Sequence, residues 1–353
     1  MSKFCIPSKP CLMICIVLMA LLGPMSDAKK CPFEAIFNFG DSNTDTGGFW
    51  AAFPTERLPF GMTYFKRPSG RATDGRVIID FLAQGLGQPF VSPYLQSIGS
   101  DYRHGANFAT LASTVLLPNT SLFVTGVSPF SLAIQLNQMK HFKVKVDELH
   151  YSGKTNLPPP DIFRKSLYTF YIGQNDFTGN LASIGIRGVK KYLPQVISQI
   201  ASTIKEIYAL GGRTFLVLNL APIEYNSMLK EAMKKTRKDL PKAEVIYVDI
   251  HTVMLKLFQH PTSHGMTYGT KACCGEGGGA YNFNPQVYCG NSKVIDGHTL
   301  NATACSDPHN YVSWDGIHAT EAANKLVAYA ILNGSYSHPA FSLYNYCDIH
   351  PFT

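Results

Sequence analysis

Short apolar runs alternate with amphipathic stretches along most of this chain. The apolar runs have the length and continuity of strands that are buried on both faces of a sheet; they cover residues 35–39, 166–172, 214–220 and 243–250. The amphipathic stretches have helical spacing, and they cover residues 192–210, 228–240 and 320–332. This alternation predicts an α/β fold with a mostly parallel sheet and helices on both of its faces.

The first 28 residues have the features of a secretory signal peptide. Lys3 and Lys9 give a basic start, residues 11–22 form an apolar core, and residues 26–28 supply a small-x-small cleavage site. No later segment reaches the roughly 18 uninterrupted apolar residues that a membrane-spanning helix needs. We therefore expect residues 29–353 to form one domain that is secreted to the extracellular space.

The formal net charge of the chain is +7, and much of it comes from one predicted helix. The basic residues of that helix are Lys230, Lys234, Lys235, Arg237 and Lys238. A solvated helix face is the usual reason for such a run, so we expect no nucleic-acid partner for a secreted chain. Weak attraction to an acidic polysaccharide stays open.

Six cysteines lie beyond the predicted signal peptide. They are Cys31, Cys273, Cys274, Cys289, Cys305 and Cys347. An even number in a secreted chain predicts disulfides, although the sequence does not choose among the possible pairings. The chain has no C-x-x-C pair, and an oxidising compartment also favours disulfides over a metal site. The glycosylation sequons at Asn119, Asn301 and Asn333 fit the same interpretation.

Candidate chemistry lies at the two ends of the chain. Ser42 follows the first predicted strand within a Gly-Asp-Ser triplet, and Asp315 precedes His318 by three residues. A serine hydroxyl becomes a useful nucleophile when an imidazole accepts its proton and a carboxylate orients that imidazole. Taken alone, Ser42 could simply cap a helix, and His318 could be structural. No G-x-S-x-G motif is present, so the nucleophile elbow of α/β-hydrolases is excluded.

Asp41, Asn43 and Asp45 mimic the start of a calcium-binding EF-hand loop. That loop needs Gly at its sixth position and Glu at its twelfth, where this chain has Thr46 and Ala52. We therefore expect no metal and no cofactor.

Two further segments have residues suited to stabilising an anion. Asn175 follows the predicted strand 166–172, where it either ties down a turn or donates its amide to an oxyanion. The segment 105–113 is rich in small residues, which allow either close packing or a main-chain N–H donor near the site.

At these residues the chain resembles the plant GDSL esterase/lipases of the SGNH hydrolase superfamily, most closely the early-nodulin-like branch. The segments that carry the resemblance cover residues 37–48, 70–76, 105–114, 171–177, 268–289 and 313–324. The resemblance implies a flavodoxin-like three-layer α/β/α fold. It also implies Ser42 as nucleophile, His318 as base and Asp315 as its orienting carboxylate. The implied oxyanion hole consists of the Ser42 N–H, the Ala112 N–H and the Asn175 amide.

The chain departs at two places from the pattern of the family that it resembles. Many members have glycine where this chain has Ala112. After Ile223, relatives continue with a further segment, whereas here the chain runs directly into Glu224, so an internal deletion at 223/224 is indicated. We expect this chain to fold less stably than full-length relatives and to be less active.

The combined prediction is a secreted carboxylic ester hydrolase that works through an acyl-enzyme intermediate. Its substrate would be an acyl or acetyl ester of a lipid, a polysaccharide or a small metabolite, and no obligate protein partner is evident. Three alternatives stay open. These are an acyltransferase with the same triad, a fucosidase-like glycosidase and an inactive isoform that acts as a secreted binding protein.

Overall fold

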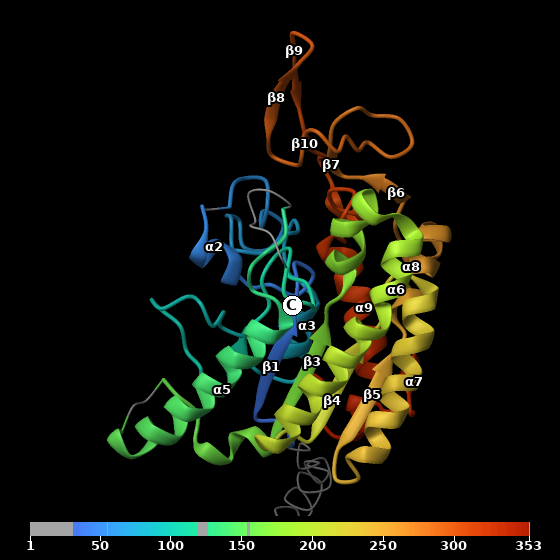
Figure 1. The fold of residues 1–353 in the computed structure, drawn as a ribbon. Coiled ribbons are helices and arrows are strands. Elements are labelled where there is room, and N and C mark those ends of the chain that lie inside the picture. Colours follow the sequence, from blue (N-terminus) through green and yellow to red (C-terminus); the bar gives the residue numbers. More distant parts are fainter. Residues whose placement is uncertain (1–30, 55, 119–125, 154–155, 353) are drawn as a thin grey trace, which may run out of the picture. The chain divides into compact units, whose positions relative to one another are not determined.

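A six-stranded sheet forms the centre of the computed structural model (Figure 1). The structure describes residues 31–54, 56–118, 126–153 and 156–352, so the predicted signal peptide and the Asn119 sequon lie outside it. The strand order is β12-β5-β4-β3-β1-β2. Five strands are parallel, and β12 pairs antiparallel with β5. The strands are β1 (Ala35–Gly40), β2 (Gly105–Asn107), β3 (Ser166–Tyr171), β4 (Thr214–Leu218), β5 (Glu244–Val248) and β12 (Ser337–His338).

The parallel part of this sheet has the 2-1-3-4-5 order of flavodoxin-like folds, as predicted. In such sheets the chain leaves β1 and β3 in opposite directions, and ligands bind beyond the carboxyl ends of these two strands. A buried polar row fixes the register there, because Asn38 of β1 accepts a hydrogen bond from the Thr169 hydroxyl and donates one to Asn107.

Helices cover both faces of the sheet. Side chains alternate along β1, so Phe37 and Phe39 join the core under α5, α6 and α7, whereas Ile36 joins the core under α3, α8 and α9. In Figure 1, α5, α6 and α7 lie in front of the sheet. The helices are α2 (Gly48–Ala52), α3 (Ile78–Gly85), α5 (Leu132–Leu149), α6 (Gln174–Ala209), α7 (Ile223–Asp239), α8 (Ile250–Gln259) and α9 (Glu321–Asn333). Short 3₁₀ turns are η1 (His150–Ser152), η2 (Pro160–Arg164), η3 (Pro261–His264), η4 (Pro308–Asn310) and η5 (Leu343–Asn345).

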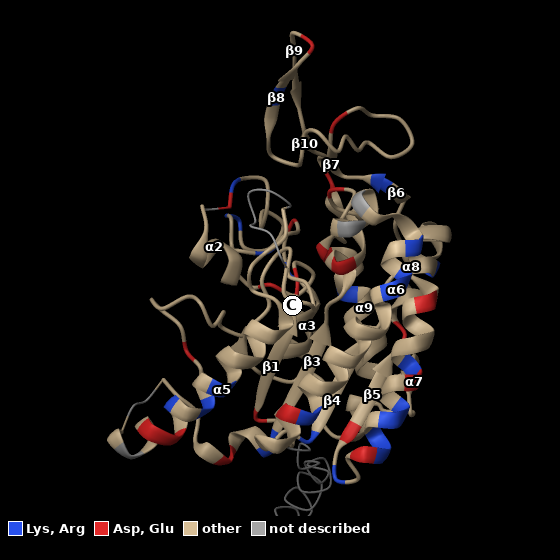
Figure 2. Cartoon of the chain, viewed as in Figure 1, with Lys and Arg blue, Asp and Glu red and all other residues tan. Residues whose placement is uncertain are grey.

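The predicted strands and helices are confirmed, although two helices are longer than expected. The helix expected over 228–240 begins at Ile223. The helix expected over 192–210 begins much earlier, at Gln174, and is broken at Gly185, where φ is 64°. None of the helices in the described ranges combines the length and the apolar content that crossing a bilayer requires. Basic and acidic residues are interspersed along α7 (Figure 2), and Lys230, Lys234, Lys235 and Lys238 are exposed, as expected for a solvated face.

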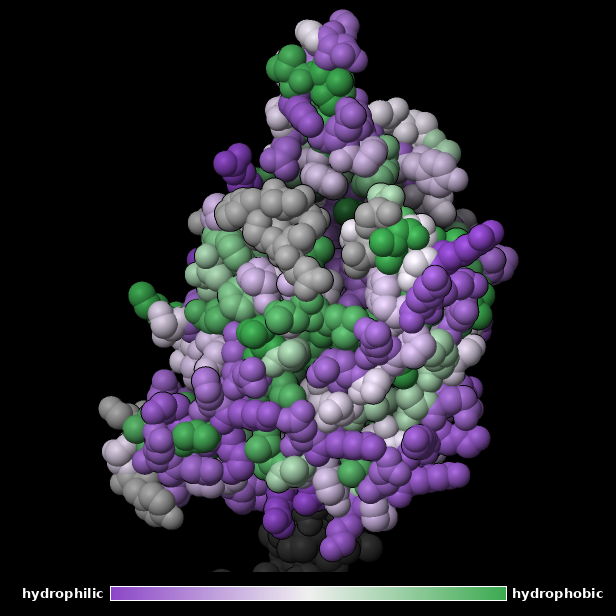
Figure 3. Space-filling view, viewed as in Figure 1, coloured by the Kyte–Doolittle hydropathy of each residue, from purple (hydrophilic) through white to green (hydrophobic). Residues whose placement is uncertain are grey.

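Residues 268–305 form a small lobe of short strands beyond the sheet. They include β6 (Tyr268–Ala272), β7 (Cys274–Gly275), β8 (Ser292–Ile295), β9 (His298–Asn301) and β10 (Thr303–Ala304), and β11 (Tyr311–Ser313) pairs with β6. The six cysteines form disulfides, as predicted, and the structure gives their pairing. Cys273–Cys305 and Cys274–Cys289 hold this lobe together, and Cys31–Cys347 joins the two ends of the described chain. The hairpin β8–β9 exposes hydrophobic side chains (Figure 3).

Candidate active site

Ser42 lies in the tight turn that follows β1. The Asp41 carbonyl accepts the N–H groups of Thr44 and Asp45, and its carboxylate accepts both the backbone and the side-chain nitrogen of Asn43. Gly40 allows this turn, because a Cβ there would come within 2.2 Å of the Thr44 hydroxyl. The turn leaves Ser42 only 7% exposed at the carboxyl end of β1.

Asp315 and His318 lie together in the loop between β11 and α9. One oxygen of Asp315, Oδ1, accepts the backbone N–H groups of Ile317 at 2.9 Å and His318 at 2.7 Å. The other, Oδ2, lies 2.7 Å from Nδ1 of the His318 ring. An ionised carboxylate only accepts hydrogen bonds, so Nδ1 must carry the proton and Nε2 of the neutral ring is left free to accept one.

The charges in this loop favour an ionised carboxylate and a basic imidazole. Burial raises the pKa of Asp315, but the charge of His318 and the hydrogen bonds from its ring and backbone hold it below the usual 3.8. Burial lowers the pKa of His318, yet the charge and hydrogen bond of Asp315, with the charge of Asp41, raise it above 6.5. Asp41 itself has a pKa raised by burial to about 6, against the lowering effect of Asn43 and of the His318 charge.

Ser42 and His318, which are 276 positions apart in the sequence, line one small cleft. The complete lining consists of Ser42, Asn43, Ala72, Thr73, Val77, His318, Ala319 and Asn324. Thr73 helps to fix the histidine loop, because its hydroxyl donates to the Ala319 carbonyl at 2.7 Å. The structure therefore brings together the three residues that the sequence singled out for nucleophilic chemistry.

The residues expected to stabilise an anion follow β2 and β3. Ala112 has φ 62°, a left-handed conformation that glycine adopts more easily. In the described part of the chain, the N–H groups of Ala112 and Ser42 donate to no protein acceptor. Asn175 lies in the first turn of α6, and its Nδ2 donates one hydrogen to the Ser113 carbonyl at 2.8 Å. An amide nitrogen carries two hydrogens, so this contact is compatible with a second donation.

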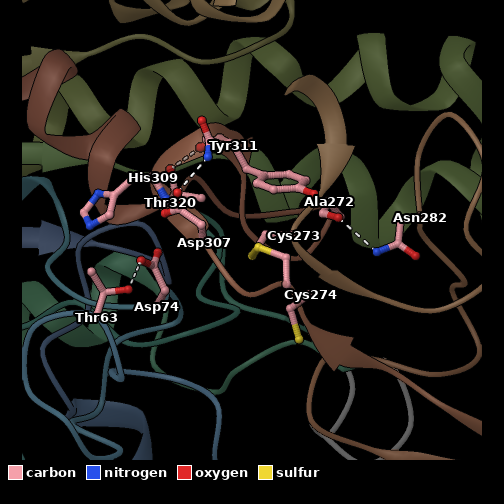
Figure 4. The surroundings of a disulfide bond; sticks show 12 residues. Thr63, Asp74, Ala272, Cys273, Cys274, Asn282, Asp307, His309, Tyr311 and Thr320 are labelled. Atoms are coloured by element: carbon pink, nitrogen blue, oxygen red, sulfur yellow. Dashed lines mark hydrogen bonds between the residues drawn. A yellow bond between two sulfur atoms is a disulfide. The ribbon is translucent and has the colours of Figure 1, made fainter. Parts of the chain in front are cut away.

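The disulfide-bonded lobe packs directly on the histidine loop, which the sequence did not indicate. The backbone N–H groups of Cys273 and Cys274 donate to the carbonyls of Ser313 and Trp314. Gly316, with φ 88°, lies under the Phe283 ring, whose nearest atom would be 2.3 Å from an added Cβ. Figure 4 shows the base of the lobe, where the Asn282 side chain bonds the Ala272 carbonyl. The Thr320 hydroxyl, at the start of α9, bonds the Tyr311 carbonyl in the same view.

The two carboxylates that follow β1 differ in their hydrogen bonds, since among the described residues Asp41 Oδ2 is buried without a hydrogen-bond partner. Both oxygens of Asp45 accept backbone N–H groups, and Asp41 bonds Asn43. Across the described residues, no group of three or more His, Cys, Asp or Glu side chains has the arrangement of a metal site.

Comparison with known proteins adds the chemical class. The model of the GDSL-like lipase/acylhydrolase family matches residues 36–331. A GDSL esterase/lipase of Arabidopsis thaliana is 62% identical over an alignment that covers 95% of this chain and 97% of the relative. Alpha-L-fucosidase 3 of the same plant is 40% identical, with 88% and 93% covered. GDSL esterase/lipase ENOD8 of Medicago truncatula is 38% identical, with 96% of each chain covered.

Proposed function

The chain belongs to the GDSL-like lipase/acylhydrolase family and is a carboxylic ester hydrolase, and we propose that Ser42, His318 and Asp315 are its catalytic triad. One observation carries this assignment. The His318 ring is fixed at Nδ1 by Asp315, and it lines the same cleft as Ser42. A base oriented in this way beside a hydroxyl is the arrangement that acyl transfer needs.

In the first half of the reaction, Ser42 Oγ attacks the ester carbonyl carbon while its proton passes to His318 Nε2. The N–H groups of Ser42 and Ala112 and the Asn175 amide then donate to the anionic oxygen of the tetrahedral intermediate. One such donor is worth about 3 to 4 kcal/mol. When the intermediate collapses, the C–O bond to the alcohol breaks and His318 Nε2 returns the proton to the leaving oxygen.

In the second half, a water molecule attacks the acyl carbon of the acyl-serine and gives a proton to His318. The bond to Ser42 Oγ then breaks, the carboxylic acid leaves, and Ser42 regains its proton. Asp315 stabilises the imidazolium that forms in each half. The proton transfers and bond changes balance without a metal ion or cofactor.

We further propose that residues 1–28 are a signal peptide and that residues 29–353 act outside the cell, in the apoplast or cell wall. Three disulfides support this proposal, since they persist in oxidising compartments. Two of the sequons, at Asn301 and Asn333, are exposed as a glycan requires. The proposed substrates are esters of lipids, polysaccharides or small metabolites, with no nucleic-acid or obligate protein partner.

The test uses the secreted mature protein, a fluorophosphonate probe and mass spectrometry, with Ser42→Ala as control. We expect one adduct, on Ser42, and hydrolysis of p-nitrophenyl esters that the Ser42→Ala variant lacks. A folded protein without an adduct would instead indicate an inactive isoform that acts by binding.

Two outcomes would change the reaction class. Ester consumption in which an added alcohol captures the acyl group in place of water would identify an acyltransferase. Because one relative is named alpha-L-fucosidase 3, p-nitrophenyl α-L-fucoside belongs in the same assay. Its hydrolysis by the Ser42→Ala variant would identify a glycosidase with a different site.

A further inference from the structure

The proposed oxyanion donor Ala112 lies on an irregular loop, which needs external support to stay in place. Residues 109–116 connect β2 with the described chain beyond it and form neither helix nor strand. Ala112 holds φ 62°, a conformation that costs a non-glycine residue about 1–2 kcal/mol. Such a conformation persists where the surroundings fix it. Two buried carboxylates, neither of which the sequence singled out for catalysis, bond this loop on either side of Ala112.

Asp45 holds the N-terminal side of the loop. It is fully buried and accepts four backbone N–H groups. Its Oδ1 accepts Gly47 at 2.8 Å and Gly48 at 2.7 Å, whereas its Oδ2 accepts Phe49 at 3.1 Å and Leu111 at 2.8 Å. Three of these donors follow the Ser42 turn, and the fourth is the residue before Ala112. One carboxylate therefore joins the turn of the nucleophile to the second oxyanion donor.

Asp176 holds the C-terminal side of the same loop. It is 2% exposed, and its two oxygens accept the N–H groups of Val115 at 2.7 Å and Leu116 at 3.1 Å. Its neighbour Asn175, the third proposed donor, bonds the carbonyl of Ser113. Three hydrogen bonds thus tie the first turn of α6 to residues 113–116, the part of the loop that follows Ala112.

We propose that Asp45 and Asp176 are positioning residues that set the geometry of the oxyanion hole by fixing residues 109–116 between the Ser42 turn and α6. The proposal rests on the proposed function of Ser42, Ala112 and Asn175. Burial raises the pKa of Asp45 to about 6 and that of Asp176 to about 7, against the lowering effect of the backbone N–H groups that they accept. In the ionised form, these hydrogen bonds are about twice as strong as neutral ones, which suits a contact that must hold a strained backbone. Because a misplacement of about 1 Å can cost about 100-fold in rate, a small shift of Ala112 is enough to be measured.

The test replaces each aspartate with asparagine, which has the same shape but only one accepting oxygen. Its amide group would face a backbone N–H, so at least one bond to residues 109–116 or 47–49 is lost. We expect Asp45→Asn and Asp176→Asn to lower kcat on a p-nitrophenyl ester about 10- to 100-fold. KM should change less than about threefold, because the oxyanion forms only in the transition state.

A second readout separates positioning from stability. A boronic acid inhibitor forms a tetrahedral adduct on the serine, so its affinity should fall in proportion to kcat in both variants. Asp249→Asn is the matched control. Asp249 is another carboxylate beyond a strand of the sheet, and it bonds Asn219 and Thr252. We expect this control to keep the wild-type kcat and boronate affinity.

Outcomes that overturn this inference differ from those that overturn the triad. If Ser42→Ala abolishes activity while both folded asparagine variants keep the wild-type kcat and boronate affinity, positioning by Asp45 and Asp176 is wrong and the triad stands. If Ser42→Ala stays active, the triad itself is wrong. If the variants fail to fold, amide hydrogen exchange of the wild-type protein tests whether these backbone hydrogen bonds hold the loop in place. Slow exchange at Leu111, Val115 and Leu116 is expected, and exchange as fast as in exposed loops would overturn the proposal.

Discussion

Replacing Asp315 by asparagine tests the triad more sharply than deleting it, because the structure dictates which way the new side chain must face. One carboxylate oxygen accepts two backbone N–H groups, from Ile317 and His318. An NH₂ group cannot accept these two hydrogen bonds, so the asparagine oxygen must take the position that faces the two N–H groups. The asparagine NH₂ group then faces Nδ1 of the His318 ring. The ring has to accept this hydrogen bond, which moves its own proton to Nε2.

A ring protonated at Nε2 cannot accept the proton of Ser42, although every heavy atom stays in place. In serine proteases, an aspartate-to-asparagine change of this kind lowers kcat by a factor of about 10⁴. At about 1.36 kcal/mol per tenfold change, the same loss here would be about 5.5 kcal/mol of transition-state stabilisation. The cleft and its lining are untouched, so KM should change little.

The pH dependence supplies an independent check. His318 acts as a base only when it is neutral, and Asp315 raises its pKa above 6.5. In the wild type, kcat/KM should therefore rise with pH through a midpoint above 6.5. In Asp315→Asn the attraction is lost while burial still lowers the pKa of His318, so the residual activity should rise at a lower pH.

The assay is hydrolysis of a p-nitrophenyl ester from pH 5 to 9, with Ser42→Ala as background. Asp307→Asn is the matched control, since Asp307 also accepts a backbone N–H in a turn, that of His309, but does not contact the His318 ring. A loss of less than tenfold in a folded Asp315→Asn variant would refute the assignment of Asp315. An unchanged midpoint on the acidic side would show that the activity does not depend on the neutral form of His318.

Three further predictions concern backbone conformation and chain length. Ala112→Gly should leave kcat unchanged and stabilise the fold by about 0.5–1 kcal/mol, because relief of the left-handed penalty exceeds the entropy cost of glycine; a lower melting midpoint would contradict this. Gly316→Ala should reduce kcat/KM at least about tenfold, because the Cβ clashes with the Phe283 ring and displaces Asp315; wild-type kinetics would contradict it. Restoring the family's segment after Ile223 should raise the thermal midpoint, and equal midpoints would refute the proposed internal deletion as a cause of lower stability.

Much of the fold followed from short-range sequence pattern. A continuous apolar run such as residues 214–220 predicts a strand that is buried inside a parallel sheet with helices on both faces. This prediction is confirmed. The first half of α6 was not predicted, because Gly179, Gly185 and Gly188 interrupt it and its side chains are mostly exposed. The resemblance to plant GDSL esterase/lipases, including the nodulin-like branch, is confirmed by the relatives.

What could not be predicted are the contacts between segments that lie far apart in the sequence. The local spacing of Asp315 and His318 was enough to suggest that they meet, since three residues separate them. By contrast, the bond between Asp45 and Leu111 spans 66 positions, and it exists only because β1 and β2 are neighbours in the sheet. The pairing of the cysteines also depends on contacts between segments that lie apart in the sequence. Cys273 and Cys274 are adjacent in sequence, yet their partners are set by how the lobe folds over the histidine loop.

The junction between β4 and α7 indicates where the proposed internal deletion would act. Asn226 closes this short connection, because its side chain accepts the Leu220 N–H and donates to the Leu220 carbonyl. The preceding residue, Tyr225, is fully buried and donates its hydroxyl to the Ile172 carbonyl, three residues before Asn175. The start of α7 therefore still supports the segment between β3 and α6, which leads directly to the proposed oxyanion donor Asn175. For this reason, any loss of activity from a missing segment should appear as a smaller folded fraction, while the kcat of the folded molecules stays unchanged.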